Sequence, residues 1–160
     1  MNGIDRPERK VYLAAAFLIL VAAGVTLSLF SRPRVIICDD SPVGRVRALN
    51  TAEMAYSYTY PEIGFSPSLA ALGPPPVGRP PSAEAADLIE AELASGTRYQ
   101  FYFEYKPGPK DKDGTIQSYS IVAFPQDWQE GKKQSFFTDQ TGVIRGTREN
   151  RKATKYDPPI

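Results

Sequence analysis

An apolar segment near the N-terminus dominates the hydrophobic pattern of the chain. Residues 11–30 include no charged side chain. An α-helix rises about 1.5 Å per residue, so a helix over this segment covers roughly 30 Å, the thickness of the hydrocarbon core of a bilayer. The pattern therefore predicts one transmembrane helix at 11–30, preceded by a cytoplasmic N-terminal segment, 1–10, and followed by a juxtamembrane linker, 31–41.

A second helix is predicted after the linker. Ser41 is a suitable N-cap, and Pro42 is a suitable first helical residue. The apolar side chains that follow at helical spacing are Val46, Leu49, Ala52 and Tyr56. Because Tyr60-Pro61 interrupts this pattern, we expect an amphipathic helix from Pro42 to about Tyr58.

The next segment mixes turn signals with short apolar stretches. Residues 62–73 are typical of a turn-rich crossing with one helical turn at 68–72. Five prolines within 73–81 predict a stiff extended connection, with a ligand for an aromatic groove as the alternative. Ser82 is suited to cap another amphipathic helix, which Ser95-Gly96 ends. The apolar side of that helix would carry Ala85, Leu88, Ile89 and Leu93.

The period of the pattern changes to two after Gly96, which predicts strands. In residues 98–105 one face would carry Tyr99, Phe101, Phe103 and Tyr105, and the other Gln100, Tyr102 and Glu104. A polar hairpin loop at 107–114 leads into a second predicted strand at 116–124.

A third predicted strand, 134–138, joins a fourth, 143–145, across a turn in which Gly142 suits a left-handed position. Short connections between these strands predict an antiparallel meander. The basic, proline-ended tail, 148–160, is expected to be flexible and loosely held. The predicted fold class is α+β: an N-terminal transmembrane helix, then an amphipathic helix packed on a four-stranded antiparallel sheet in a soluble domain at 42–147.

Composition narrows the possible chemistry. The 160 residues include no histidine, which removes the usual general base near neutral pH and most zinc sites. Cys38 is the single cysteine, so no intrachain disulfide can form. The 19 Lys+Arg nearly balance the 18 Asp+Glu, so no overall charge favours nucleic acid. We expect a protein that is not an enzyme and has no cofactor.

A charged N-terminal segment followed by an apolar run can also belong to a cleaved signal peptide or to a lipoprotein. A cleaved signal peptide could end at Ala22-Ala23-Gly24, although the apolar run continues to Phe30. A lipoprotein would use Cys38, which follows isoleucine instead of a small residue. An uncleaved anchor fits the full apolar run better. Basic residues before the run slightly outnumber those just after it, which favours a cytoplasmic N-terminus. We therefore expect a single-pass protein of the inner membrane whose C-terminal domain is periplasmic or extracellular.

Three groups of residues have features of a candidate site. Asp111 and Asp113, two positions apart before Gly114, resemble part of a calcium loop, but no downstream glutamate completes it and two lysines flank it, so a solvated turn is expected. Asp39-Asp40 is expected to favour the start of the helix at Ser41. The aromatic residues beside Arg98 and Lys106 are expected to face the core instead of stacking nucleic acid bases. We predict no catalytic, cofactor-binding or metal-binding residues.

The order of the predicted parts resembles that of type IV pilins and of the pseudopilins of type II secretion. The likeness covers roughly residues 43–145 and is carried by RALNTAE at 47–53, YP at 60–61, LAALG at 69–73, LASGT at 93–97 and FFTDQTGVIR at 136–145. The N-terminus departs from this family, because prepilins have a glycine directly before the apolar helix and a glutamate at the fifth mature position. Here Arg9 and Lys10 precede the apolar run, although a cut after Gly3 would place Glu8 fifth.

This resemblance implies a membrane-anchored structural or interaction protein of a bacterial envelope assembly, of the secretion or pilus type. Its partners would be membrane lipid through residues 11–30 and other proteins, or further copies of the chain, and no nucleic acid. The alternative is a tethered extracytoplasmic ligand-binding or sensory module. In that case the proline-rich loop and the lysine-bearing hairpin would line a pocket.

Overall fold

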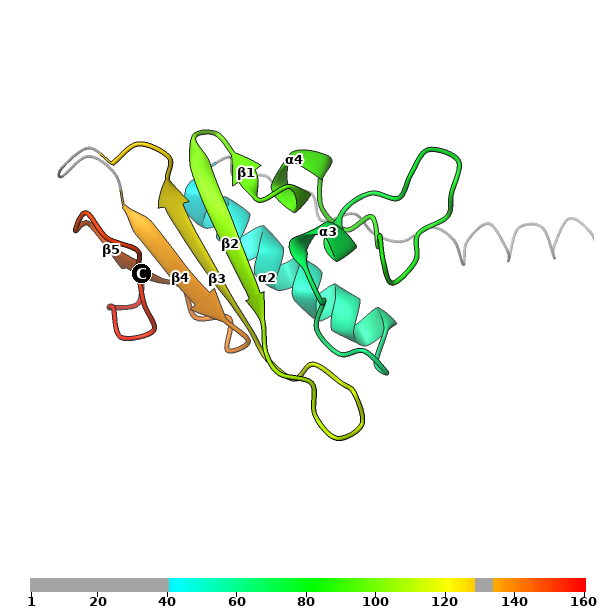
Figure 1. Ribbon diagram of the computed structural model, residues 1–160. Coiled ribbons are helices and arrows are strands. Elements are labelled where there is room, and N and C mark those ends of the chain that lie inside the picture. The colour runs from blue at the N-terminus through cyan, green and yellow to red at the C-terminus, as the bar shows by residue number, and fades with distance from the viewer. Residues whose placement is uncertain (1–40, 129–133) are drawn as a thin grey trace, which may run out of the picture. The chain divides into compact units, whose positions relative to one another are not determined.

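The computed structural model describes residues 41–128 and 134–160. This part is an α+β domain in which one long helix lies against an antiparallel sheet (Figure 1). The helices are α2 (Pro42–Thr59), α3 (Leu69–Leu72) and α4 (Ala91–Ala94). The strands are β1 (Thr97–Arg98), β2 (Phe101–Pro107), β3 (Tyr119–Pro125), β4 (Ser135–Asp139) and β5 (Arg145–Thr147). Their spatial order is β1-β2-β3-β4-β5 with every pair antiparallel, which confirms the predicted meander.

Helix α2 forms where the sequence predicts it. The Ser41 hydroxyl accepts a hydrogen bond from the Gly44 N–H at 3.0 Å, and Pro42 occupies the first turn. The helix ends at Thr59, where the Tyr60 N–H still donates to the Tyr56 carbonyl at 2.9 Å. The four predicted core positions are all fully buried: Val46, Leu49, Ala52 and Tyr56.

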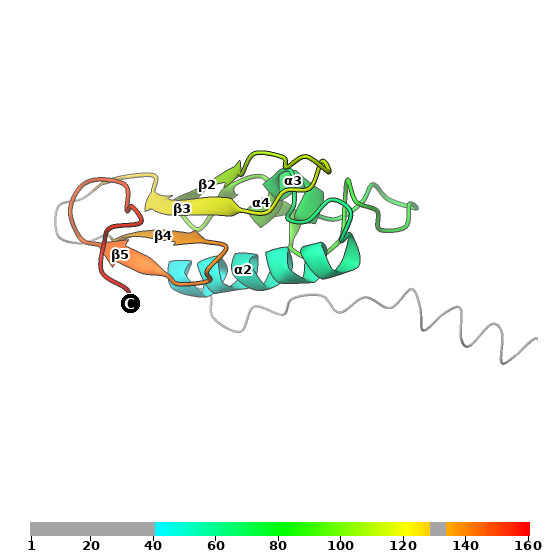
Figure 2. The same cartoon turned by 90° about the horizontal axis from the view of Figure 1, so that it is seen from below.

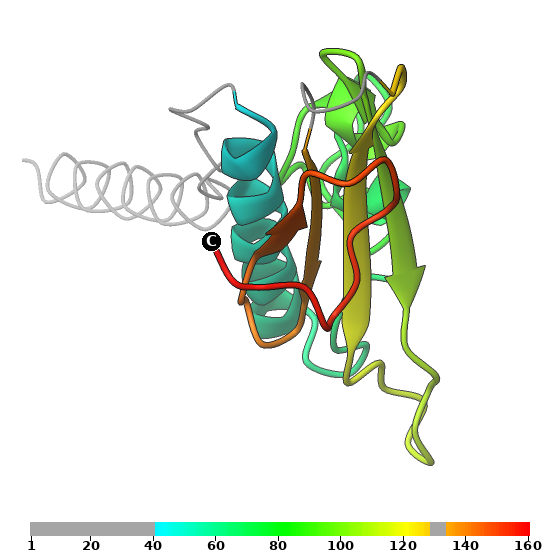
Figure 3. The same cartoon turned by 90° about the vertical axis from the view of Figure 1, so that its left-hand side faces the viewer.

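Helix α2 covers one face of the sheet. Figures 2 and 3 show it running along one side of the sheet, where it contacts β3 and β4, and its buried side chains join one hydrophobic core with those of the sheet. The sheet side of this core consists of Phe103, Tyr119, Ile121, Ala123 and Phe136. The opposite face of the sheet is not covered by α2, and this outer face is the candidate interaction surface.

The sheet has five strands, not the four that the sequence predicts. The predicted strand at 98–105 is divided, because Tyr99 and Gln100 form a two-residue turn with φ of 46° and 64° between β1 and β2. Two positive φ angles are typical of a type I′ hairpin turn, which normally carries asparagine or glycine. Tyr-Gln gives no such signal, so the alternation in the sequence predicts a single strand through this turn. Tyr99 is therefore 58% exposed instead of facing the core.

The predicted second amphipathic helix is wrong over most of its length. Only Ala91–Ala94 is helical, and Ser82 instead closes a tight turn with Ala85 through two backbone hydrogen bonds. Residues 86–88 are held by the C-terminal end of α3, since the N–H groups of Ala86 and Leu88 donate to the Ala71 and Leu72 carbonyls at 2.8 Å each. The last carbonyls of a helix need such donors. This non-local pairing is invisible to a periodicity argument.

The crossing between α2 and α4 matches the prediction in outline. The Ser68 hydroxyl caps α3 by accepting from the Ala71 N–H at 3.3 Å. In the proline-rich loop the Arg79 N–H donates to the Pro76 carbonyl at 3.0 Å, and Gly78 has a φ of 82°. A four-residue turn with positive φ at its third residue has the features of type II. The exposed loop is therefore bent at Pro76–Arg79, which interrupts a continuous polyproline helix.

The strands after the hairpin loop are close to the predicted positions. Strand β3 begins at Tyr119, three residues after the predicted start, and β5 begins at Arg145, where the predicted strand ends. Gly142 has a φ of 73°, as the left-handed turn position requires. The predicted transmembrane segment, 11–30, lies outside the described residues. Within the residues that the structure describes, no helix is long and apolar enough to cross a bilayer.

Candidate interaction surface

The outer face of the sheet, opposite α2, carries a row of aromatic side chains. Tyr102 on β2 and Phe124 on β3 are register partners, and their ring centroids are 5.5 Å apart. Trp128 continues the row, stacked on Phe124 at 6.3 Å with an interplanar angle of 9°. Tyr102 is 43% exposed. Aromatic side chains that remain accessible on one flat face are a common feature of protein interfaces.

A charged pair lies over the same row. Lys152 Nζ is 2.5 Å from Glu104 Oε1 and 4.2 Å from the centroid of the Phe124 ring. Both side chains are about half exposed, so the pair itself adds little stability. It nevertheless brings the tail onto β2 and β3. We name Tyr102, Glu104, Phe124, Trp128 and Lys152 the outer patch.

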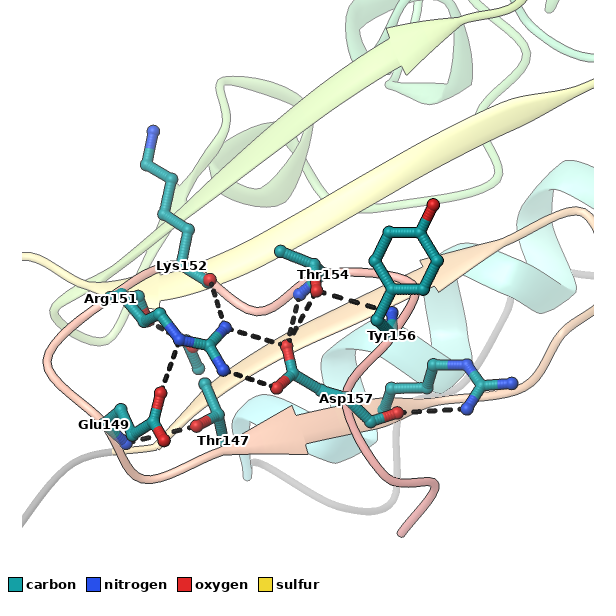
Figure 4. Close-up of polar contacts among 9 residues, drawn as sticks. Thr147, Glu149, Arg151, Lys152, Thr154, Tyr156 and Asp157 are labelled. Carbon is teal, nitrogen blue, oxygen red and sulfur yellow. Dashed lines mark hydrogen bonds and ion pairs between the residues drawn. The ribbon is translucent and has the colours of Figure 1, made fainter.

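The C-terminal tail forms a strap across the outer face beside this patch. In Figure 4 the guanidinium of Arg151 lies against the Asp157 carboxylate, with Nη2–Oδ1 and Nη1–Oδ2 distances of 2.6 and 2.9 Å. The same carboxylate accepts from the N–H of Thr154 at 2.7 Å. The hydrogen bonds from Arg151, aided by that N–H, hold the pKa of Asp157 well below its usual range.

The end of the tail then pairs with the sheet edge. The Gly146 N–H donates to the Pro158 carbonyl at 3.1 Å, and the Ile160 N–H donates to the Ile144 carbonyl at 3.0 Å. Ser135, fully buried on β4, donates its hydroxyl hydrogen bond to the Arg151 carbonyl at 2.8 Å. The structure thus gives residues 148–160 fixed contacts, in place of the loosely held tail that composition predicted. Local polarity could not reveal the buried Asp157 that anchors it.

A buried carboxylate on α2 holds this helix to the segment that follows it and to β2. Glu53 on α2 is fully buried, and its two oxygens accept from the Ser66 N–H at 2.9 Å and the Ser66 hydroxyl at 2.5 Å. The Tyr105 hydroxyl donates to the Ser66 carbonyl at 2.7 Å. Burial raises the pKa of Glu53 to about 7, against the hydrogen bonds from Ser66 that lower it. The network ties α2, the crossing and β2 together.

The aromatic residues of the predicted strand 98–105, which could have stacked nucleic acid bases, mostly pack inside the domain. Phe103 is buried, and Phe101 stacks on Phe136 at 6.4 Å. Arg98 forms ion pairs with Glu90 and Glu92, and its guanidinium lies 4.3 Å from the centroid of the Tyr99 ring. These contacts support the reading of this strand as core-facing, with the exception of Tyr99 in the turn.

The candidate cation loop is occupied by the protein's own hydrogen bonds. Asp111 Oδ1 accepts from the N–H groups of Asp113 and Thr115 at 3.0 and 2.8 Å, and Oδ2 accepts from the Gln117 amide at 3.1 Å. The backbone hydrogen bond from Thr115 is the main cause of the lowered pKa of Asp111. Within residues 41–128 and 134–160 no group of three or more potential ligand side chains is arranged to hold a metal ion. Asp39-Asp40 lies outside the described residues.

Among the depressions on the described part of the surface, two lie outside the outer patch. One of about 550 Å³ lies beside the tail and is lined in part by Thr147, Asp157 and Ile160. The other, of about 320 Å³, lies along β2 and is lined in part by Ala70 and Tyr105. Neither is lined by the proline-rich loop or by Lys110 or Lys112, which the ligand-binding alternative would use.

Comparison of the chain with protein-family models, with curated proteins and with solved structures finds no match. The fold and the surface therefore carry the functional argument by themselves. The sequence alone indicated Tyr102 as an outward residue of its strand, whereas Trp128 and Lys152 gave no signal. The burial of Glu53 does have a signal in the sequence, because Glu53 falls seven residues after Val46 and so lies on the apolar side of α2.

Proposed function

We propose that this protein is a membrane-anchored, pilin-like structural or interaction protein of a bacterial envelope assembly, of the secretion or pilus type, and that it contacts protein partners through the outer patch. The apolar segment at 11–30 holds the chain in the inner membrane. The domain that follows is periplasmic or extracellular and presents the patch to other subunits.

The observation that carries this proposal is the difference between the two faces of the sheet. One face is covered by a long helix whose first residue, Pro42, follows the apolar segment closely in sequence. The other face keeps the exposed ring of Tyr102 and a partly exposed ion pair between Glu104 and Lys152. An anchor, a helix and an antiparallel meander with one face that the helix leaves uncovered are the parts that an interaction module of this kind needs. The likeness to pilins in the sequence supports the same reading.

Site-specific photo-crosslinking in cells tests the proposal. A benzophenone amino acid placed at Tyr102 of the full-length chain is expected to give crosslinked products containing the chain and an envelope protein or a second copy. The matched position is Tyr58 on the exposed side of α2, which is 90% exposed compared with 43% for Tyr102. We expect at least tenfold less product from Tyr58. Products from Tyr58 and none from Tyr102 would contradict the assigned surface.

A further inference from the structure

The edge of the sheet beside β2 is incompletely paired. Strand β1 pairs with β2 only through Thr97–Tyr102 and Arg98–Phe101, and the last hydrogen bond along this line is from the Phe103 N–H to the Gly96 carbonyl at 2.8 Å. The residues before Gly96 belong to α4 and its C-cap, so they do not continue this pairing beside β2. Strand β2 continues to Pro107 on its other side, where it pairs with β3.

The direction of the free backbone groups follows from this last hydrogen bond. In an antiparallel strand the N–H and C=O of one residue point to the same neighbour, and successive residues alternate. Because the Phe103 N–H points toward the β1 side, the N–H and C=O of Tyr105 point there too. Within the part of the chain that the structure describes, neither group has a hydrogen-bond partner on that side. The Phe103 and Pro107 carbonyls also face this edge.

A groove runs along the same edge. It has a volume of about 320 Å³, and β2 forms one side through Phe103, Tyr105 and Pro107. Its other walls carry mostly small side chains from α3, α4 and the residues that flank these helices: Ser68, Leu69, Ala70, Ala94, Ser95 and Gly96. In Figure 1 the two short helices lie beside the β2 edge, so the groove is bounded on the side away from the sheet. Small walls leave room for a backbone to approach β2.

We propose that this groove binds a short extended peptide segment of a partner protein, which adds to β2 as an antiparallel strand in line with β1. The central peptide residue exchanges two hydrogen bonds with Tyr105, and the residue two positions before it donates its N–H group to the Pro107 carbonyl. Because Gly96 already lies opposite Phe103, the peptide leaves β2 after the central residue. The central side chain points toward Ala70 and is small or β-branched. Strand addition of this kind takes affinity from the main chain and specificity from alternate side chains.

The proposal goes beyond the proposed function and does not depend on the membrane anchor. It is tested on the purified full-length protein, labelled with ¹⁵N, by adding the blocked pentapeptide acetyl-Ala-Thr-Val-Thr-Ala-amide. The Tyr105 amide is expected to shift downfield and to exchange with solvent at least tenfold more slowly. No change at the Tyr105 amide up to the solubility limit of the peptide would overturn the proposal, whether or not the crosslinking at Tyr102 succeeds.

N-methylated peptides test the direction of pairing. Methyl groups on the nitrogens of Val and the first Ala remove the two donors that face β2, and binding should weaken at least tenfold. Methyl groups on the two Thr nitrogens, which face away, should change binding less than threefold. Equal effects of the two peptides would show that binding does not use the strand edge.

Two matched variants test the location. Ala70→Arg fills the groove, whereas Ala91→Arg makes the same change at an exposed alanine of α4 that does not line it. We expect Ala70→Arg to lose peptide binding and Ala91→Arg to keep it. Because both alanines are exposed, both variants should keep the unfolding midpoint of the parent, which shows that each is folded. Unchanged binding by folded Ala70→Arg would overturn the proposed site.

Discussion

Replacing Gly64 by alanine is expected to lower the free energy of unfolding by about 3 kcal/mol. The backbone at Gly64 has a φ of 79°, which costs an L-residue roughly 1–2 kcal/mol. A Cβ there would also overlap the Ile116 carbonyl oxygen, and relieving such an overlap costs about 1–3 kcal/mol. That carbonyl cannot move away freely, because it accepts from the Phe65 N–H at 2.9 Å. Urea unfolding followed by the fluorescence of Trp128, the single tryptophan, measures the loss.

Gly78→Ala is the matched control. Gly78 has almost the same φ, 82°, but an added Cβ would meet no atom within 4 Å. The control therefore carries the backbone cost alone, about 1 kcal/mol. Similar losses in the two variants would mean that the crossing loop does not approach the hairpin at Ile116 as closely as the structure describes.

The stability of the domain is expected to fall by about 3 kcal/mol between pH 4.5 and pH 7 because of Glu53. Burial raises the pKa of this carboxyl from 4.5 in the unfolded chain to about 7 in the folded domain, and each pKa unit corresponds to about 1.4 kcal/mol. The folded state therefore binds the proton more tightly. The contribution of Glu53 to the free energy of unfolding is therefore complete below pH 4.5, is lost as the pH rises through 7, and is absent above that. Asp157 acts in the opposite sense at lower pH, since its pKa is lowered.

Glu53→Gln should remove this slope and should make the domain more stable than the parent at pH 8, where the parent must keep a charge buried. Glu62→Gln provides the control, because Glu62 is an exposed carboxylate and the slope should survive its loss. Guanidinium unfolding at pH 5, 6, 7 and 8 gives the four free energies for each variant. A slope that persists in Glu53→Gln would assign the pH dependence to another group.

Local signals predicted the elements whose own residues decide their structure. Ser41, Pro42 and the apolar spacing to Tyr56 define α2 because capping and amphipathic periodicity are local properties. The alternation in β2 and the glycine at 142 succeeded for the same reason. These elements also determined the α+β class and the meander.

The failures occurred where distant segments supply the hydrogen bonds. Leu88 belongs to the apolar set at helical spacing, yet the N–H groups of residues 86–88 donate to the carbonyls at the end of α3. The turn at Tyr99 and Gln100 has positive φ angles, which these residue types do not predict, and Tyr99 packs against Arg98. The tail is basic and rich in proline, but Asp157 is buried against Arg151. None of these contacts can be inferred from neighbouring residues.

The outer patch was predictable only in part. Tyr102 and Glu104 could be placed on the outward side of their strand from alternation. Trp128 and Lys152 join them through a loop and the folded-back tail, so their positions depend on tertiary structure. The open edge of β2 could not be predicted, because its existence depends on how far β1 extends.

The central claim, an anchored interaction protein, is tested most directly by the location and mass of the full-length chain after cell breakage. We expect the chain in the membrane fraction, resistant to washing with alkaline carbonate and released by detergent, with a mass that corresponds to an intact N-terminal segment. A chain recovered entirely in buffer without detergent, or one that starts near Val25, would contradict the account.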